Sequence, residues 1–85
     1  MGSYYNKKPD NFSQLVGQRI TLFCTNYVYS GTLANAALTH LTLDKPCIVY
    51  ETGDLTTPEW TDAQPLPTPW RVQISAIESW GVLKQ

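Results

Sequence analysis

The stretch that decides the fold runs from Leu15 to Leu43; it begins L-V-G-Q-R-I-T-L-F-C-T-N-Y-V-Y-S-G-T-L and ends on H-L-T-L. Apolar residues fall on every second position of its extended parts, which is typical of strands that bury one face. Gly17 precedes the first strand, and Gly31 lies inside the second, where glycine favours a sharp bend. The stretch predicts an all-β protein, a small five-stranded antiparallel barrel whose strands are strongly bent.

The same alternation continues beyond this stretch. A turn is expected wherever glycine, proline or asparagine interrupts it, and Asp10 can cap a short helical turn over Asn11–Leu15. We expect one strand to be broken at Asp44-Lys45-Pro46 and the last two strands to be joined by a tight turn at Ser75-Ala76. The expected strands are Gln18–Cys24, Tyr27–Asn35, Leu38–Leu43 resuming as Cys47–Thr52, Trp70–Ile74 and Ile77–Leu83.

The length and the proline distribution indicate a single domain. The chain has 85 residues, of which 10–85 are expected to form the domain and 1–9 a flexible polar arm. Segment 54–69 is acidic and carries four prolines, so it is expected to be a stiff connector between strands. A domain this small buries a limited core, and self-association is one common way to stabilise it.

The charge balance argues against general nucleic-acid binding. Six Lys+Arg and seven Asp+Glu give a net charge of −1, and the cations are scattered, whereas phosphate binding needs them clustered. Charged residues make up only 15% of the chain and aromatic residues 12%, which indicates a surface that a partner covers. No apolar run is long enough to span a membrane, so we expect a cytoplasmic protein with reduced thiols and no membrane partner.

Two groups of residues resemble the motifs of the Sm-like proteins, the small SH3-like barrels that form rings and often bind RNA. The first motif is approximated by Gly17, Ile20, Leu22, Gly31, Leu33, Leu41 and Leu43, and the second by the run Val72–Trp80. Where that family places an acidic residue and an asparagine near its uridine pocket, this chain has Ala37 and His40. The chain also looks like short barrel proteins from bacterial and mobile-element genomes. The resemblance implies ring assembly and RNA binding.

Catalytic and metal chemistry find little support in the sequence. Cys24, His40 and Cys47 could in principle ligate a metal, but zinc sites usually show paired ligands at short spacing, and this chain has none. With a single histidine and neither a paired carboxylate nor a phosphate-binding glycine loop, we expect no enzyme. No cofactor and no metal are therefore predicted, and the two cysteines are expected to be buried and free.

We predict a non-enzymatic, self-assembling interaction module, because an incompletely closed sheet has an edge that can pair with a second copy. The alternative is a ring that binds single-stranded RNA through His40, Asn35, Arg19 and Lys45. Another protein could also bind through loop 54–69. Aromatic residues commonly anchor interfaces, and the candidate subunit-interface residues are Trp60, Trp70, Val72, Ile74, Trp80 and Val82.

Overall fold

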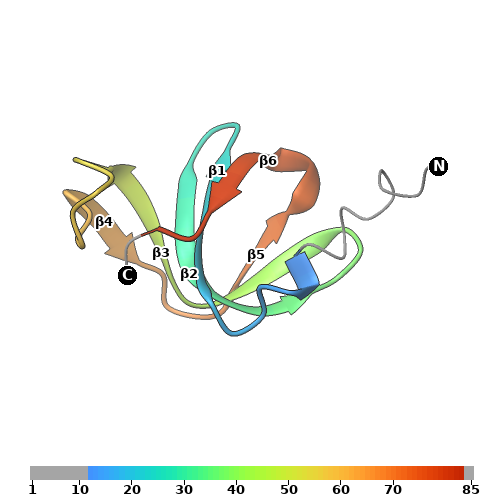
Figure 1. Ribbon diagram of the computed structural model, residues 1–85. Helices are drawn as coiled ribbons and strands as arrows, with labels where there is room; N and C mark the ends of the chain where they lie inside the picture. Colours follow the sequence, from blue (N-terminus) through green and yellow to red (C-terminus); the bar gives the residue numbers. More distant parts are fainter. Residues whose placement is uncertain (1–11, 84–85) are drawn as a thin grey trace.

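The computed structural model describes residues 12–83 and shows a mostly antiparallel six-stranded sheet (Figure 1). The predicted all-β class is confirmed. A short 3-10 turn, η2 (Ile74–Ala76), joins the last two strands. The strands are β1 (Arg19–Cys24), β2 (Val28–Ala36), β3 (His40–Glu51), β4 (Asp62–Pro65), β5 (Trp70–Gln73) and β6 (Ile77–Gly81).

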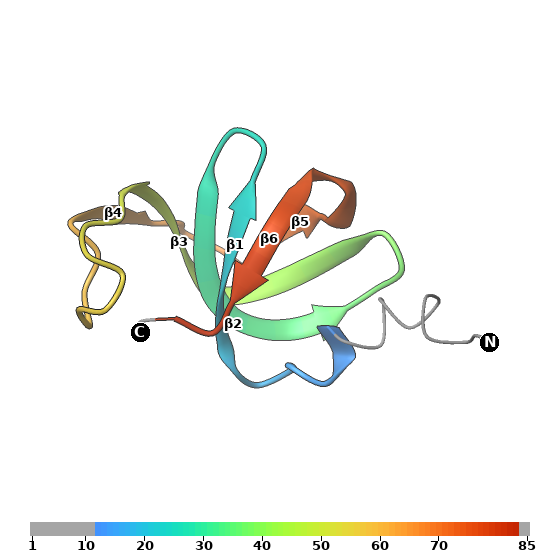
Figure 2. The ribbon, with the colours of Figure 1, turned by 45° about the horizontal axis from the view of Figure 1, so that its top comes forward.

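The prediction of a closed five-stranded barrel is wrong. The strand order is β4-β3-β2-β1-β6, with β5 paired to β3, and the described residues show no ladder between β5 and β6. Figure 2 shows how η2 carries the chain from the β3 side of the sheet to β1. Because η2 redirects the chain after four residues of β5, the outer edges of β5 and β6 do not pair, and the sheet stays open.

Strand β3 is continuous, although the sequence predicted a break at Asp44-Lys45-Pro46. Its twelve residues run from His40 to Glu51, and the strand bends at Lys45, whose φ is 48°. On the facing strand β2 the register shifts at Gly31, between Ser30 and Thr32, as expected for a bend at a bulge. A β-carbon on Gly31 would lie 2.9 Å from the Leu43 β-carbon, so only glycine lets β2 approach β3 this closely.

The segment 54–69, predicted as a connector, contains strand β4. Its residues pair with the second half of β3, while β5 pairs with the first half, so the two short strands share one long partner. Pro65 ends β4 at the edge of the sheet, where a residue without an N–H group costs no ladder bond. Prolines 67 and 69 then separate β4 from β5.

The core lies on one face of the sheet. Alternate residues of β1 and β3 are fully buried there, as the sequence pattern predicted, and they pack with one residue from each of three other segments. The buried members are Phe12, Ile20, Leu22, Leu33, Leu41, Leu43 and Val72. Their burial is the main apolar contribution to stability, since the hydrophobic effect scales with the apolar area removed from water.

The predicted helical turn over Asn11–Leu15 begins outside the described residues, as does the predicted arm, residues 1–9. Within residues 12–83, helical conformation ends at Ser13 and turns follow, with the Leu15 N–H donating to the Phe12 carbonyl at 2.9 Å. The chain enters β1 through Gly17, whose φ is 96°. The Gly17 N–H donates to the Leu33 carbonyl at 2.8 Å, which fixes this entry to the end of β2.

The opposite face of the sheet is also partly covered. Thr21 and Ser30 are cross-strand partners there, both fully buried, although the sequence alternation is typical of strands that bury one face only. Within residues 12–83 the hydroxyls of these two side chains have no hydrogen-bond partner. The segment after β6 runs across β1 and β2, as both ribbon views show (Figure 1, Figure 2). Burial on this face therefore comes at the cost of two unsatisfied hydroxyls.

Candidate functional site

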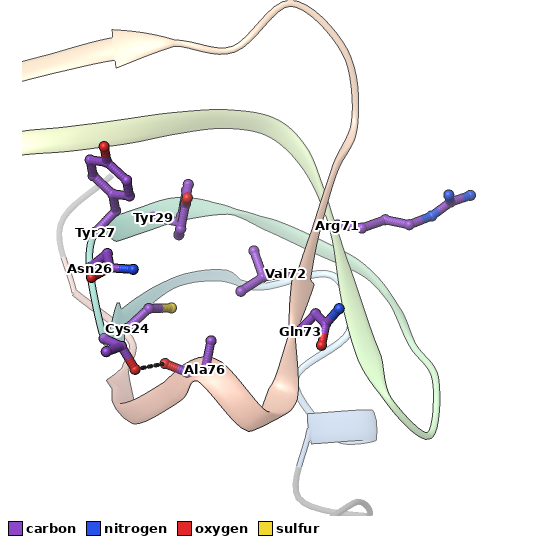
Figure 3. A pocket seen from close by; sticks show the side chains of 9 residues that line it. Cys24, Asn26, Tyr27, Tyr29, Arg71, Val72, Gln73 and Ala76 are labelled. Atoms are coloured by element: carbon purple, nitrogen blue, oxygen red, sulfur yellow. Dashed lines mark hydrogen bonds between the residues drawn. The ribbon is translucent and has the colours of Figure 1, made fainter.

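A hollow of about 300 Å³ lies between the β1–β2 hairpin and strand β5. One wall is the β1–β2 hairpin, which contributes residues 24–27 and Tyr29, and the opposite wall is β5 with the end of η2 (Figure 3). In Figure 3 Val72 and Ala76 point between these walls, whereas the Arg71 side chain extends away. Elements that are distant in sequence thus face each other across the hollow.

Two tyrosines form the aromatic part of the hollow. The rings of Tyr27 and Tyr29 meet edge to face, with centroids 6.3 Å apart and an angle of 61°. Burial raises the pKa of the Tyr29 phenol, and a hydrogen bond with the Trp70 side chain partly opposes that shift. Trp70 itself is 37% exposed on β5, so the aromatic surface continues from the hairpin to the opposite wall.

The base of the hairpin is tied to η2. The Thr25 N–H donates to the Ala76 carbonyl at 2.9 Å, and the Thr25 hydroxyl contacts the same oxygen at 3.4 Å. Beside this contact, the half-buried Cys24 thiol lies 3.8 Å from the Leu22 carbonyl. Burial, and to a smaller extent the negative charge of Glu78, raises the pKa of the Cys24 thiol. Cys24 is therefore protonated and weakly nucleophilic near neutral pH.

Strand β5, which lines the hollow, and strand β6, which follows η2, each have one edge without a partner in residues 12–83. Strand β5 pairs only with β3, and β6 pairs only with β1. The Ile74 N–H donates to the Thr39 carbonyl at 2.9 Å, and the alternation of an antiparallel ladder then directs the Gln73 N–H away from β3. The charged residue of β5 is Arg71 and that of β6 is Glu78, and both are exposed.

The four residues predicted to bind RNA lie in two pairs. The Arg19 guanidinium donates to the Lys45 carbonyl at 3.1 Å, which places these two residues side by side at the bend of β3. Asn35 and His40 lie near the β2–β3 hairpin, where Asn35 faces Thr42 and His40 faces Gln73. The role of these residues stays a prediction.

The candidate interface residues differ in exposure. Val72 is buried in the core and Ile74 packs against it, so their side chains stabilise the sheet from within. Trp70, Trp80 and Val82 are exposed, and the Trp80 ring also contacts Phe12 with centroids 5.2 Å apart. Trp60 is half-buried in the segment between β3 and β4. The exposed members of the set thus lie on or next to the unpaired edges of β5 and β6.

The loop predicted to bind another protein begins with a local turn. The Asp54 carboxylate accepts from the Thr56 N–H at 2.9 Å and from its hydroxyl at 2.8 Å, and Leu55 between them is exposed. Such side-chain to backbone bonds give a loop a defined shape without a strand. The protein-binding role of this loop stays a prediction.

The residues considered as metal ligands are not brought together. Within residues 12–83 no group of three or more His, Cys, Asp or Glu side chains is close enough to hold a metal. Cys24 lines the hollow, whereas Cys47 lies beside Arg19 on the other side of β2 and β3, and both thiols are free. Burial raises the pKa of the Cys47 thiol, although Arg19 partly opposes this shift.

Sequence reasoning missed the hollow. Tyr27 and Tyr29 were assigned only to an alternating strand, and Gln73 and Ala76 only to a strand and a turn. Two tyrosines two positions apart on one strand face were the available signal, since such rings lie side by side. The contact between Thr25 of the hairpin and Ala76 of η2 was not predictable, because these residues are 51 positions apart.

No family model, no curated protein and no solved structure matches this chain. Among residues 12–83, the structure has no helix with the length and apolar character needed to cross a bilayer.

Proposed function

We propose that this chain is a non-enzymatic module that assembles with copies of itself by pairing the free edge of β5 with the free edge of β6 in a neighbour. The observation that carries the proposal is that β5 and β6 each have one edge without a partner strand in residues 12–83. An exposed edge presents backbone donors and acceptors that a second strand can satisfy. Repeated head to tail, this contact closes a ring or continues as a filament.

The charges on the two edges support this pairing. Arg71 on β5 and Glu78 on β6 are exposed and opposite in sign, so an approaching neighbour brings unlike charges together. Charge complementarity of this kind selects the partner edge more than it adds affinity. Exposed Trp70, Trp80 and Val82 supply the apolar area that such an interface buries. The resemblance to the ring-forming Sm-like proteins supports the same proposal.

Charge reversal tests the proposal. Arg71→Glu and Glu78→Arg each place like charges at the interface and should weaken self-association about tenfold. The double variant restores unlike charges and should assemble as the unchanged chain does. A mixture of the two single variants should also assemble, because each edge then meets a complementary edge. Light scattering after size-exclusion chromatography measures all four samples. An unchanged chain that stays monomeric at micromolar concentration would overturn the proposal.

A backbone variant checks that strand pairing carries the contact. Gln73 has φ at −72°, which proline accepts, and its N–H points away from β3, so Gln73→Pro removes a donor at the free edge while leaving the β3–β5 ladder intact. Gln73→Ala removes the same side chain and keeps the N–H. The proline variant should dissociate and the alanine variant should not. Equal effects of the two would show that the β5 edge is not the contact.

The same experiment tests the alternative function, which is binding of single-stranded RNA. Absorbance at two ultraviolet wavelengths reports nucleic acid that elutes with the protein. Protein free of nucleic acid that also ignores uridine- and adenine-rich oligomers at low salt would dispose of the alternative. This outcome leaves self-assembly untouched, because the edge contact involves neither Asn35 nor Lys45.

A further inference from the structure

The hollow has the size and lining of a small-molecule site, independently of self-assembly. Its volume of about 300 Å³ is at the lower end of the range for ligand pockets, which are mostly apolar with few polar groups. Tyr27 and Tyr29 supply aromatic surface, Val72 and Ala76 supply aliphatic surface, and the amide side chain of Asn26 lies at the hairpin end (Figure 3). This combination can hold one ring and hydrogen-bond a substituent on it.

We propose that the hollow binds a small, neutral aromatic molecule. An aromatic ring is favoured over an aliphatic one because the Tyr27–Tyr29 pair is already edge to face, and a third ring can extend that arrangement. The described lining has no carboxylate, and its single cation, Arg71, directs its side chain away from the hollow. No lining group is therefore placed to neutralise a charged ligand inside.

The titrating groups of the hollow agree with a neutral ligand. Burial raises the pKa of both the Cys24 thiol and the Tyr29 phenol, so the site disfavours negative charge. Glu78 on β6 faces Cys24, and its negative charge adds to the effect of burial on the thiol pKa, while Cys24 and Tyr27 likewise add to the raised pKa of Tyr29. Asn26 and Gln73 offer uncharged donors and acceptors instead.

Protection of Cys24 from alkylation tests the proposal. The experiment uses the Cys47→Ser variant, so that Cys24 in the hollow is the thiol that reacts. The probes are indole, phenol, cyclohexanol and benzoate. For a Kd of about 1 mM, a typical value for so small a ligand, about 5 mM indole should slow alkylation about sixfold. Phenol should also protect, whereas cyclohexanol and benzoate should not.

Two pairs of variants locate the binding in the hollow. Ala76→Leu adds a side chain that fills the hollow and should abolish protection, while Ser75→Leu on the same turn lies outside the lining and should not. Tyr27→Ala should raise the Kd for indole about fivefold through loss of the aromatic contact, so that protection at about 5 mM indole falls from about sixfold to about twofold. Tyr50→Ala removes a similarly exposed tyrosine outside the lining and should leave protection unchanged.

Nuclear magnetic resonance gives a second readout. Indole should shift the methyl signals of Val72 and Ala76 and leave that of Ala37 unmoved, whether or not Cys24 reacts with the alkylating agent. Equal protection by cyclohexanol would overturn the aromatic specificity. Absence of both protection and methyl shifts at millimolar indole would overturn the site. The monomer fraction of the unchanged chain, separated by size-exclusion chromatography, should also bind indole, so failure here and failure of self-assembly are distinguishable.

Discussion

Replacing Gly31 with alanine should destabilise the protein, because β2 and β3 approach each other closely at this residue. The added β-carbon would lie 2.9 Å from the Leu43 β-carbon and 3.2 Å from both the Asp44 carbonyl oxygen and the Pro46 α-carbon. None of these atoms is the free end of a flexible side chain. The neighbouring strand must therefore move, at the point where Lys45 already has a positive φ.

The magnitude follows from two opposing effects. Forcing one extra carbon into a packed site costs about 1–3 kcal/mol. Alanine also restricts the unfolded chain, which returns about 0.5 kcal/mol when the native φ is compatible, and Gly31 is not among the positive-φ glycines. We expect the free energy of unfolding to fall by roughly 1.5 kcal/mol, the middle of the packing cost less the return from the unfolded chain. At a urea dependence of about 1 kcal/mol per molar, the midpoint should fall by about 1.5 M.

Gly81→Ala is the matched control. Its β-carbon would meet only the Leu83 γ-carbon at 4.0 Å, an ordinary contact, so this variant should unfold at the same urea concentration as the unchanged chain or slightly above it. Urea unfolding followed by circular dichroism measures both variants. A Gly31→Ala protein whose midpoint matches that of Gly81→Ala would refute the claim that the close approach of β2 to β3 requires glycine.

Three further outcomes are expected. Leu41→Ala leaves a cavity in the core and should lower the free energy of unfolding by about 2–5 kcal/mol. Leu38→Ala, at the exposed hairpin tip, should change it by less than about 0.5 kcal/mol in the same urea assay. Thr21→Val removes a buried hydroxyl that has no partner in residues 12–83 and should raise the thermal midpoint. Burial raises the pKa of Cys24 and Tyr29, so the folded state favours their protonated forms. The free energy of unfolding should therefore fall as pH rises above about 8.5, and Cys24→Ser should make the fall shallower.

The parts of the fold that sequence predicted are those set by local alternation. Ile20 and Leu22 on one strand and Leu41 and Leu43 on another repeat with period two, and all four are buried in the core. Gly31 was predicted to mark a bend because glycine has no packing role inside a strand, and the register of β2 and β3 shifts there. Such features depend on neighbours within a few residues.

The parts that sequence did not predict depend on long-range contacts. Period-two alternation cannot say whether two strand edges meet, so the open gap between β5 and β6 was missed. Pro65 suggested a connector because proline cannot donate, but on an edge that donor is not needed, and β4 forms. Strand β3 stays continuous because Lys45 adopts a positive φ, which the residue pattern does not predict for a lysine.

Strand β3 pairs with β5 along its first half and with β4 along its second half. The free energy needed to open the two halves locally should therefore differ. The half of β3 that pairs with β5 contributes Leu41 and Leu43 to the core, whereas the half that pairs with β4 contributes Val49, which lies outside that cluster. Amide protons of the outer half can therefore exchange with solvent through a local excursion that leaves the core assembled. Amide exchange should therefore be faster in the half of β3 that pairs with β4 than in the half that pairs with β5.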